Sequence, residues 1–166
     1  MSWFPWLLWL HIFGAIVAFG PTFAFPIIGA MGGKEPMHAN FATRITHRIS
    51  NGITIPLAVV QGITGIGLLL VTGRIAHLFE QKNYWLVLGI TLYVIALAFS
   101  YFVQAPRVVK IIDMTSTPPP PPGPGAAPAG PPPALMALIK AVQQGGMLLT
   151  VLIVAIIFLM VVKPLS

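Results

Sequence analysis

The chain has 166 residues, of which 57 % are hydrophobic and 7 % are charged, and its 9 basic and 3 acidic side chains give a formal charge of +6. A mean hydropathy of +0.90 is too high for a soluble domain and indicates an integral membrane protein. The lack of cysteine excludes disulfides, thiolate metal sites and thiol catalysis. The basic residues are scattered, so the charge does not indicate nucleic-acid binding.

Four apolar stretches follow one another along the chain, and a span needs about 20 apolar residues. They cover residues 6–31, 53–72, 84–103 and 145–162. Pro21 and Pro26 predict a kink or break in the first stretch, and Pro106 predicts the end of the third. Short alternating strands are not visible, so helices are expected. We therefore predict an all-α fold, in which residues 1–166 form a single membrane domain that is a four-helix bundle.

Basic residues in the connections predict the orientation of this bundle. Six lie between spans one and two or between spans three and four: Lys34, Arg44, Arg48, Arg107, Lys110 and Lys140. The other three lie on the opposite side: Arg74, Lys82 and Lys163. Because cytoplasmic connections carry an excess of Lys and Arg, we expect both termini on the outer side of the membrane.

The third connection contains a low-complexity, proline-rich segment at residues 117–133. Such a segment is extended and cannot build a core. We interpret it as a cytoplasmic linker, with a docking site for a proline-binding domain as the alternative. The following residues, 134–144, are expected to be helical and either to extend span four or to lie along the membrane surface, with a bend at Gly145 and Gly146.

One histidine, His11, lies inside a predicted span. Such a group costs free energy unless it meets a partner, and it is therefore a functional candidate. At helical spacing its face carries the small residues Gly14 and Ala18. These residues leave a slot that serves either close helix packing or a b-type haem with His11 as axial ligand of the iron. In the packing alternative, His11 hydrogen-bonds Tyr93, Thr91 or another polar group of the bundle.

Met160, in span four at a depth close to that of His11, is the candidate second ligand of a haem iron. Methionines in an apolar chain serve mostly in packing, which is the alternative. No Asp, Glu, Lys or Arg lies deep inside a span, which argues against a proton pump or an ion channel. The carboxylates all lie in connections, so no catalytic residues are predicted.

A second candidate site lies at the cytoplasmic end of span two. Arg44, His47 and Arg48 share one helical face there with Asn51. We interpret this face as an anchor for anionic lipid headgroups. The alternative is a binding site for a haem propionate or another acidic group.

Five segments, in chain order, carry a family resemblance: LHIFGAIVAFG, RITHRIS, QGITGIGLLL, YWLVLG and FLMVVKP. Together they resemble a family of small four-helix bacterial membrane proteins described as predicted integral membrane proteins of unknown function. The layout is similar, more distantly, to HemJ-type protoporphyrinogen oxidases and to the membrane domain of copper-resistance D proteins. That likeness places His11 at the position of their haem-ligating histidine. Span three lacks the lysine that HemJ-type chains carry after the tryptophan, here Trp85.

These observations predict a multi-pass protein of the bacterial inner membrane that serves as a non-enzymatic accessory or assembly subunit, with a b-type haem on His11 as its candidate cofactor. Two alternatives stay open, a membrane porphyrin-oxidising enzyme of HemJ type and a purely structural bundle that packs against a larger membrane complex. The expected partners are the lipid bilayer and either other membrane-protein subunits or further copies of the chain.

Overall fold

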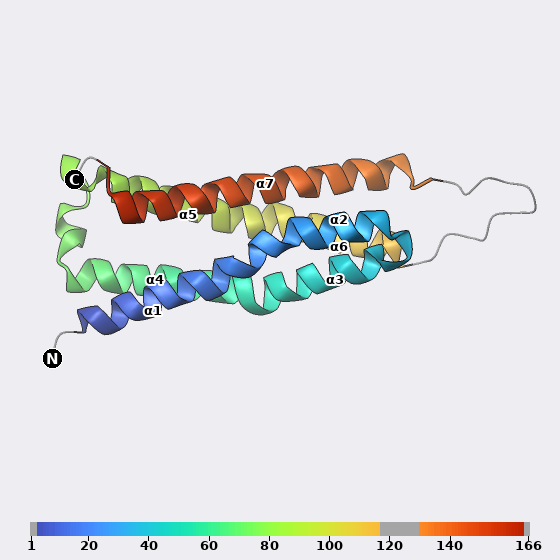
Figure 1. Ribbon diagram of the computed structural model, residues 1–166. Helices are drawn as coiled ribbons and strands as arrows, with labels where there is room; N and C mark the ends of the chain where they lie inside the picture. The colour runs from blue at the N-terminus through green and yellow to red at the C-terminus, as the bar shows by residue number, and fades with distance from the viewer. Residues whose placement is uncertain (1–2, 117–129, 165–166) are drawn as a thin grey trace, which may run out of the picture.

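The computed structural model describes residues 3–116 and 130–164, which form an elongated helical bundle that contains no strand in these ranges (Figure 1). Four helical stretches are long and apolar enough to cross a membrane: Phe4–Lys34, Ala39–Val71, Gln81–Thr115 and Pro133–Val162. The predicted all-α bundle with four membrane helices is therefore confirmed. The first helix begins and the last helix ends at the same end of the bundle, and the side of the membrane that this end faces stays a prediction. Most of the predicted linker lies outside the described residues.

The first stretch is broken where its two prolines predict. It consists of α1 (Phe4–Phe19), a 3₁₀ turn (Gly20–Ala24) and α2 (Phe25–Lys34). Pro21 and Pro26 each stand in the first positions of a new helical segment. At such a position the missing N–H removes no helical hydrogen bond, so the proline starts a segment at little cost.

The second and third stretches share a different interruption, a π-helical turn between two α-helices. They consist of α3 (Ala39–Ile49), the π turn Ser50–Thr54 and α4 (Ile55–Val71), and of α5 (Tyr84–Phe99), the π turn Ser100–Gln104 and α6 (Ala105–Thr115). A proline follows each π turn, Pro56 in α4 and Pro106 in α6. The prediction that the third helix ends near Pro106 is wrong, because the widened turn accommodates the proline ring and the helix continues beyond it.

The fourth stretch, α7 (Pro133–Val162), is one uninterrupted α-helix. The expected bend at Gly145 and Gly146 is therefore wrong, and residues 134–144 extend span four. Gly145 serves a close approach instead, because a β-carbon there would collide with the side-chain amide of Gln104. The same amide donates a hydrogen bond from Nε2 to the carbonyl of Val142 at 2.7 Å, which fastens the second π turn to α7.

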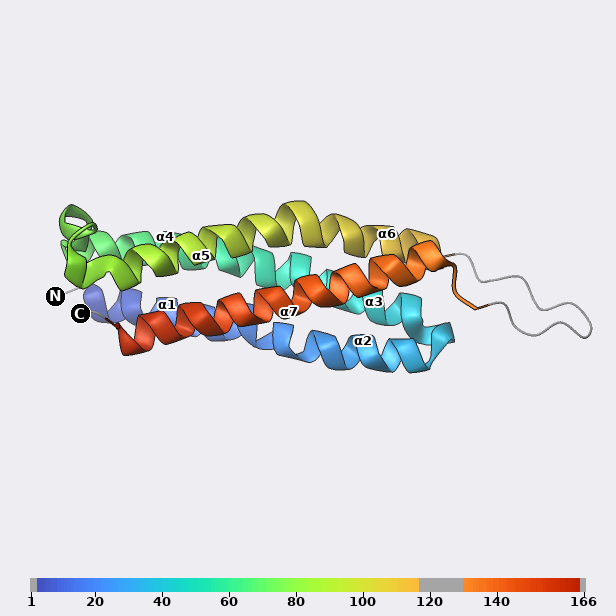
Figure 2. The same cartoon turned by 90° about the horizontal axis from the view of Figure 1, so that it is seen from above.

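The helices pack differently in the two halves of the bundle (Figures 1 and 2). In the half that holds both termini, α1 lies along α4 and α5 lies along α7. In the other half, α2 lies along α3, α3 along α6, and α6 along α7. Asn40 of α3 strengthens this second half by donating from Nδ2 to the carbonyl of Ile112 in α6 at 3.0 Å.

Buried and exposed side chains are arranged as in a protein whose solvent is hydrocarbon. Thr54, Gln61 and Thr64 are buried, whereas Ile16 and Ile63 are exposed over 65 % and 63 % of their surface. In water, each Å² of apolar surface that stays uncovered would lose about 25 cal/mol of the free energy that burial contributes to folding. A bilayer covers this surface, while the polar side chains require partners inside the protein.

The contact between α4 and α5 depends on Tyr93. Its hydroxyl donates to the carbonyl of Ala58 at 2.7 Å. The same hydroxyl lies on Gly62, where a β-carbon would stand 2.6 Å from Oη and 3.2 Å from Cζ. The absence of a side chain at Gly62 therefore creates the space in which Tyr93 reaches the opposite backbone.

Because Tyr93 and Gly62 share this space, we expect Gly62→Ala and Tyr93→Phe to be energetically coupled. Tyr93→Phe loses one interhelical hydrogen bond and costs about 0.6–1 kcal/mol. Gly62→Ala costs about 1–3 kcal/mol in the wild type, because it displaces the tyrosine, and less in the Tyr93→Phe background, where the nearest atom is gone. The free energy of unfolding in mixed micelles measures the cycle. Gly29→Ala, where nothing lies within 4 Å of the added carbon, is the matched control, and strictly additive costs would contradict the assignment.

Candidate functional site

The candidate site lies between α1 and α4 and centres on His11. The Nδ1 atom of His11 is 2.9 Å from Oγ1 of Thr64. His11 is half-buried and Thr64 is buried. The ring therefore meets a polar partner inside the bundle. The partner is Thr64 rather than Tyr93 or Thr91, both of which donate to backbone carbonyls.

The contacts of Thr64 favour one tautomer of His11. The Thr64 hydroxyl also lies 3.0 Å from the carbonyl oxygen of Gln61 in donor geometry. A carbonyl only accepts and a hydroxyl has one proton to give, so a Thr64 hydroxyl that donates to Gln61 can only accept from His11. The hydroxyl then accepts from Nδ1–H of His11. In a neutral ring this arrangement leaves the lone pair on Nε2.

Glycines on both helices bring the His11 ring and α4 together. A β-carbon at Gly65 would stand 3.3 Å from Cε1 of His11, and one at Gly14 would stand 2.9 Å from Oε1 of Gln61. Gly14 is buried and Ala18 is fully buried. The Gln61 side chain thus fills the space beside Gly14, which favours close packing at this position. That Gly14 and Ala18 contact a cofactor stays a prediction.

Gln61 presents an acceptor that the protein leaves unpaired. Its Oε1 is buried and has no hydrogen-bond partner among the described residues. A buried acceptor without a partner costs about 1–3 kcal/mol. At the seam between α1 and α4, this oxygen can therefore accept a hydrogen bond from one further donor, such as a water molecule.

Met160 lies in the other helix pair. Its Cε stands 2.5 Å from the position that a β-carbon of Gly89 would take. The side chain also packs against the buried cluster of Trp85, Leu86 and Leu159. The structure therefore packs the Met160 side chain of α7 against α5, away from the seam that holds His11, and its role as second haem ligand stays a prediction.

The second predicted site lies on α3. Arg44 and Arg48 are exposed and His47 is half-buried, and Nε2 of His47 lies 3.2 Å from Nδ2 of Asn51. His47 and Asn51 line a cavity of about 490 Å³ together with aromatic and proline rings from the second π turn and α6. The predicted helix with one polar face is therefore present. Its affinity for headgroups or another anion stays a prediction.

Sequence reasoning missed Thr64 as the partner of His11, and Gln61 as the acceptor of the Thr64 hydroxyl. The signal was available in the spacing of α4, because Gln61, Thr64 and Gly65 fall at steps of three and four residues and so form one polar and small face. No group of three or more His, Asp or Glu side chains that suits a metal ion occurs within residues 3–116 and 130–164. Within these ranges His11 is therefore not part of a clustered metal site.

Comparison with known proteins gives one finding. A family model described as predicted integral membrane protein (DUF2269) matches residues 5–164. No curated protein and no solved structure matches the chain. These comparisons give no support to the more distant likeness to HemJ-type oxidases or copper-resistance D proteins.

The hydroxyl of Thr64 is the group that we expect to matter for stability at this site. Thr64→Val removes the acceptor of Nδ1–H and costs about 1–3 kcal/mol, whereas Thr64→Ser keeps the hydroxyl and costs less than about 1 kcal/mol. Adding His11→Leu to Thr64→Val recovers most of the loss, because replacing both partners by apolar groups leaves nothing unpaired. Unfolding free energies in mixed micelles measure all three variants. Equal costs for valine and serine would show that the hydroxyl is not the acceptor.

Proposed function

Because the chain belongs to the DUF2269 family of predicted integral membrane proteins, we propose that it is a non-enzymatic accessory subunit of the bacterial inner membrane that holds a b-type haem through Nε2 of His11. The observation that carries this proposal is the hydrogen bond of Nδ1 to Thr64. Histidines that bind a metal through one nitrogen donate the other N–H to a fixed acceptor, which holds the tautomer and the orientation of the ring.

The residues around His11 fit an axial ligand in their chemistry. Thr64 accepts from Nδ1, and Gly65 lets the ring lie against α4, so the ring is held from one edge and Nε2 keeps its lone pair. A bound haem would supply one-electron redox chemistry. In this chain His11 would hold the iron, and Thr64 would orient the ring.

The space expected beside Gly14 and Ala18 does not contribute to this fit. Gln61 fills the position beside Gly14, and Ala18 is fully buried. The proposal therefore rests on His11 alone and not on Met160. The exposed arginines Arg44 and Arg48, on the face that they share with His47, are proposed to anchor the bundle to anionic headgroups.

A second candidate function is a purely structural bundle that packs against other membrane subunits. The observation that favours it is the filled space beside Gly14, which makes the seam between α1 and α4 a packing contact. The two candidate functions make different demands on Nε2 of His11. Haem binding requires its lone pair, and a structural bundle does not.

The haem proposal predicts a Soret band in the protein purified in mild detergent from haem-replete membranes, with one haem for each chain by pyridine haemochrome assay. His11→Ala abolishes the band, because it removes the ligand. Met160→Leu leaves it unchanged, and so does His38→Ala, the matched control at an exposed histidine. Thr64→Val keeps the haem but shifts its reduction potential, because the ring loses the acceptor of Nδ1–H.

Two results would overturn parts of this proposal. Lack of a Soret band in the wild-type protein, also after reconstitution with haemin, would remove the cofactor and leave the structural candidate. Turnover of protoporphyrinogen by the purified protein would contradict the non-enzymatic role and favour the porphyrin-oxidising alternative.

A further inference from the structure

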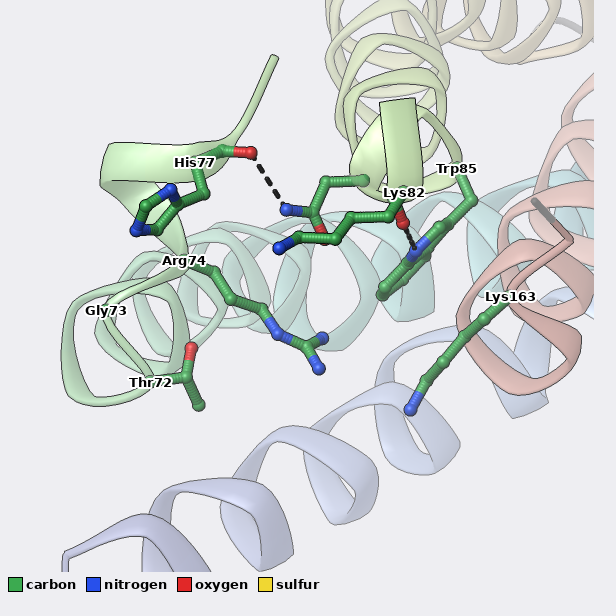
Figure 3. A pocket seen from close by; sticks show the side chains of 8 residues that line it. Thr72, Gly73, Arg74, His77, Lys82, Trp85 and Lys163 are labelled. Carbon is green, nitrogen blue, oxygen red and sulfur yellow. Dashed lines mark hydrogen bonds between the residues drawn. The ribbon is translucent and has the colours of Figure 1, made fainter. Parts of the chain in front are cut away.

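A second cavity lies at the end of the bundle that holds both termini (Figure 3). Its volume is about 340 Å³, and Arg74, Lys82, Trp85 and Lys163 are among the residues that line it. Three separate segments meet there: the connection after α4, the first turn of α5 and the end of α7. We refer to it as the end cavity.

Trp85 forms the wall against which the cations of the end cavity lie. The indole is 5 % exposed, and its Nε1 donates to the carbonyl of Lys82 at 3.0 Å. The guanidinium carbon of Arg74 and Nζ of Lys163 each lie 5.8 Å from the centroid of the ring. Both are at the distance of a cation–π contact, so the indole holds two positive charges beside the same cavity.

The connection that carries Arg74 is fixed by hydrogen bonds at its far end. Asn83 is buried and donates from Nδ2 to the carbonyl of His77 at 2.8 Å. Gly73, with a φ of 67°, turns the chain out of α4 at the near end. Arg74 and Lys82 therefore lie on a folded connection.

The single carboxylate of this connection is already engaged. Glu80 pairs with Nζ of Lys82 at 2.8 Å and also with the ring of His77. The hydrogen bond from Lys82, followed by that from His77, lowers the pKa of Glu80, so this carboxylate stays ionised and paired. Arg74 and Lys163 have no ion-pair partner within residues 3–116 and 130–164.

All three basic residues that the sequence places on this side of the membrane line the end cavity: Arg74, Lys82 and Lys163. Arg74 and Lys163 lie at one indole with no counter-charge among the described residues, and an anion between them relieves their mutual repulsion. We propose that the end cavity binds a phosphate group, either in the headgroup of an anionic phospholipid or as free phosphate. A guanidinium offers the paired donors that phosphate oxygens accept, and tryptophan is favoured at headgroup depth.

The test uses the full-length protein in a neutral detergent and two probes, dihexanoyl phosphatidylglycerol and inorganic phosphate. Dihexanoyl phosphatidylcholine, which is zwitterionic and has no net charge, is the comparison. Binding is followed by isothermal titration calorimetry at low salt. If phosphatidylglycerol binds and inorganic phosphate does not, the ligand is a lipid headgroup. If inorganic phosphate binds as tightly as phosphatidylglycerol, the ligand is a free anion. Either result supports the phosphate site, and binding weakens as salt is raised.

Charge removal is expected to weaken binding about fivefold for Arg74→Gln and about 25-fold for Arg74→Gln combined with Lys163→Gln, since a basic residue near a membrane surface contributes about a factor of five. The matched control is Arg107→Gln combined with Lys110→Gln, at the other end of the bundle, and it binds as the wild type does. Glu80→Gln releases His77 and Lys82 and is expected to tighten binding several-fold, which misfolding would not produce.

Two outcomes would overturn the phosphate site. One is wild-type binding in the Arg74→Gln, Lys163→Gln variant. The other is equal binding of phosphatidylglycerol and phosphatidylcholine, which would show that the cavity does not distinguish an anionic headgroup from a zwitterionic one. Neither outcome bears on His11, so the two proposals fail independently.

Discussion

The structure depends on one constraint, which is that a polar side chain in hydrocarbon must find its partner inside the protein. Apolar burial cannot hold these helices together in a bilayer, because lipid is as apolar as leucine. The described residues include no large side chain that is fully buried. Three helix contacts contain a polar side chain that crosses to its neighbour: His11 to Thr64 between α1 and α4, Tyr93 to α4, and Gln104 to α7.

Each of these three crossings is matched by a glycine on the opposite helix. Gly65 faces the ring of His11, Gly62 faces the hydroxyl of Tyr93, and Gly145 faces the amide of Gln104. A side chain at any of these positions would separate the helices and lengthen the hydrogen bond. The glycines of α4 and α7 therefore provide the space that the crossing polar side chains occupy. The contact of His11 with Thr64 is one of these three polar contacts between helices.

The sequence predicted the four membrane helices and the break at Pro21, because hydropathy and the missing N–H of proline act locally. It did not predict which helices are neighbours, so the partner of His11 was sought at Tyr93 or Thr91 on α5 or at another polar group of the bundle. The continuation past Pro106 depends on a π turn, whose extra residue leaves no mark in the hydrophobic pattern. The end cavity was missed because Arg74 and Lys163 are far apart in the chain and meet only around Trp85.

The central claim is that Thr64 holds His11 with the proton on Nδ1 and the lone pair on Nε2. Nitrogen-15 NMR of the haem-free protein, labelled at histidine and reconstituted in lipid bilayers, tests it most directly. The account predicts that Nδ1 of His11 is protonated and Nε2 is not, and that the Nδ1 resonance moves in Thr64→Val. A proton on Nε2, or a His11 spectrum that Thr64→Val leaves unchanged, would contradict it.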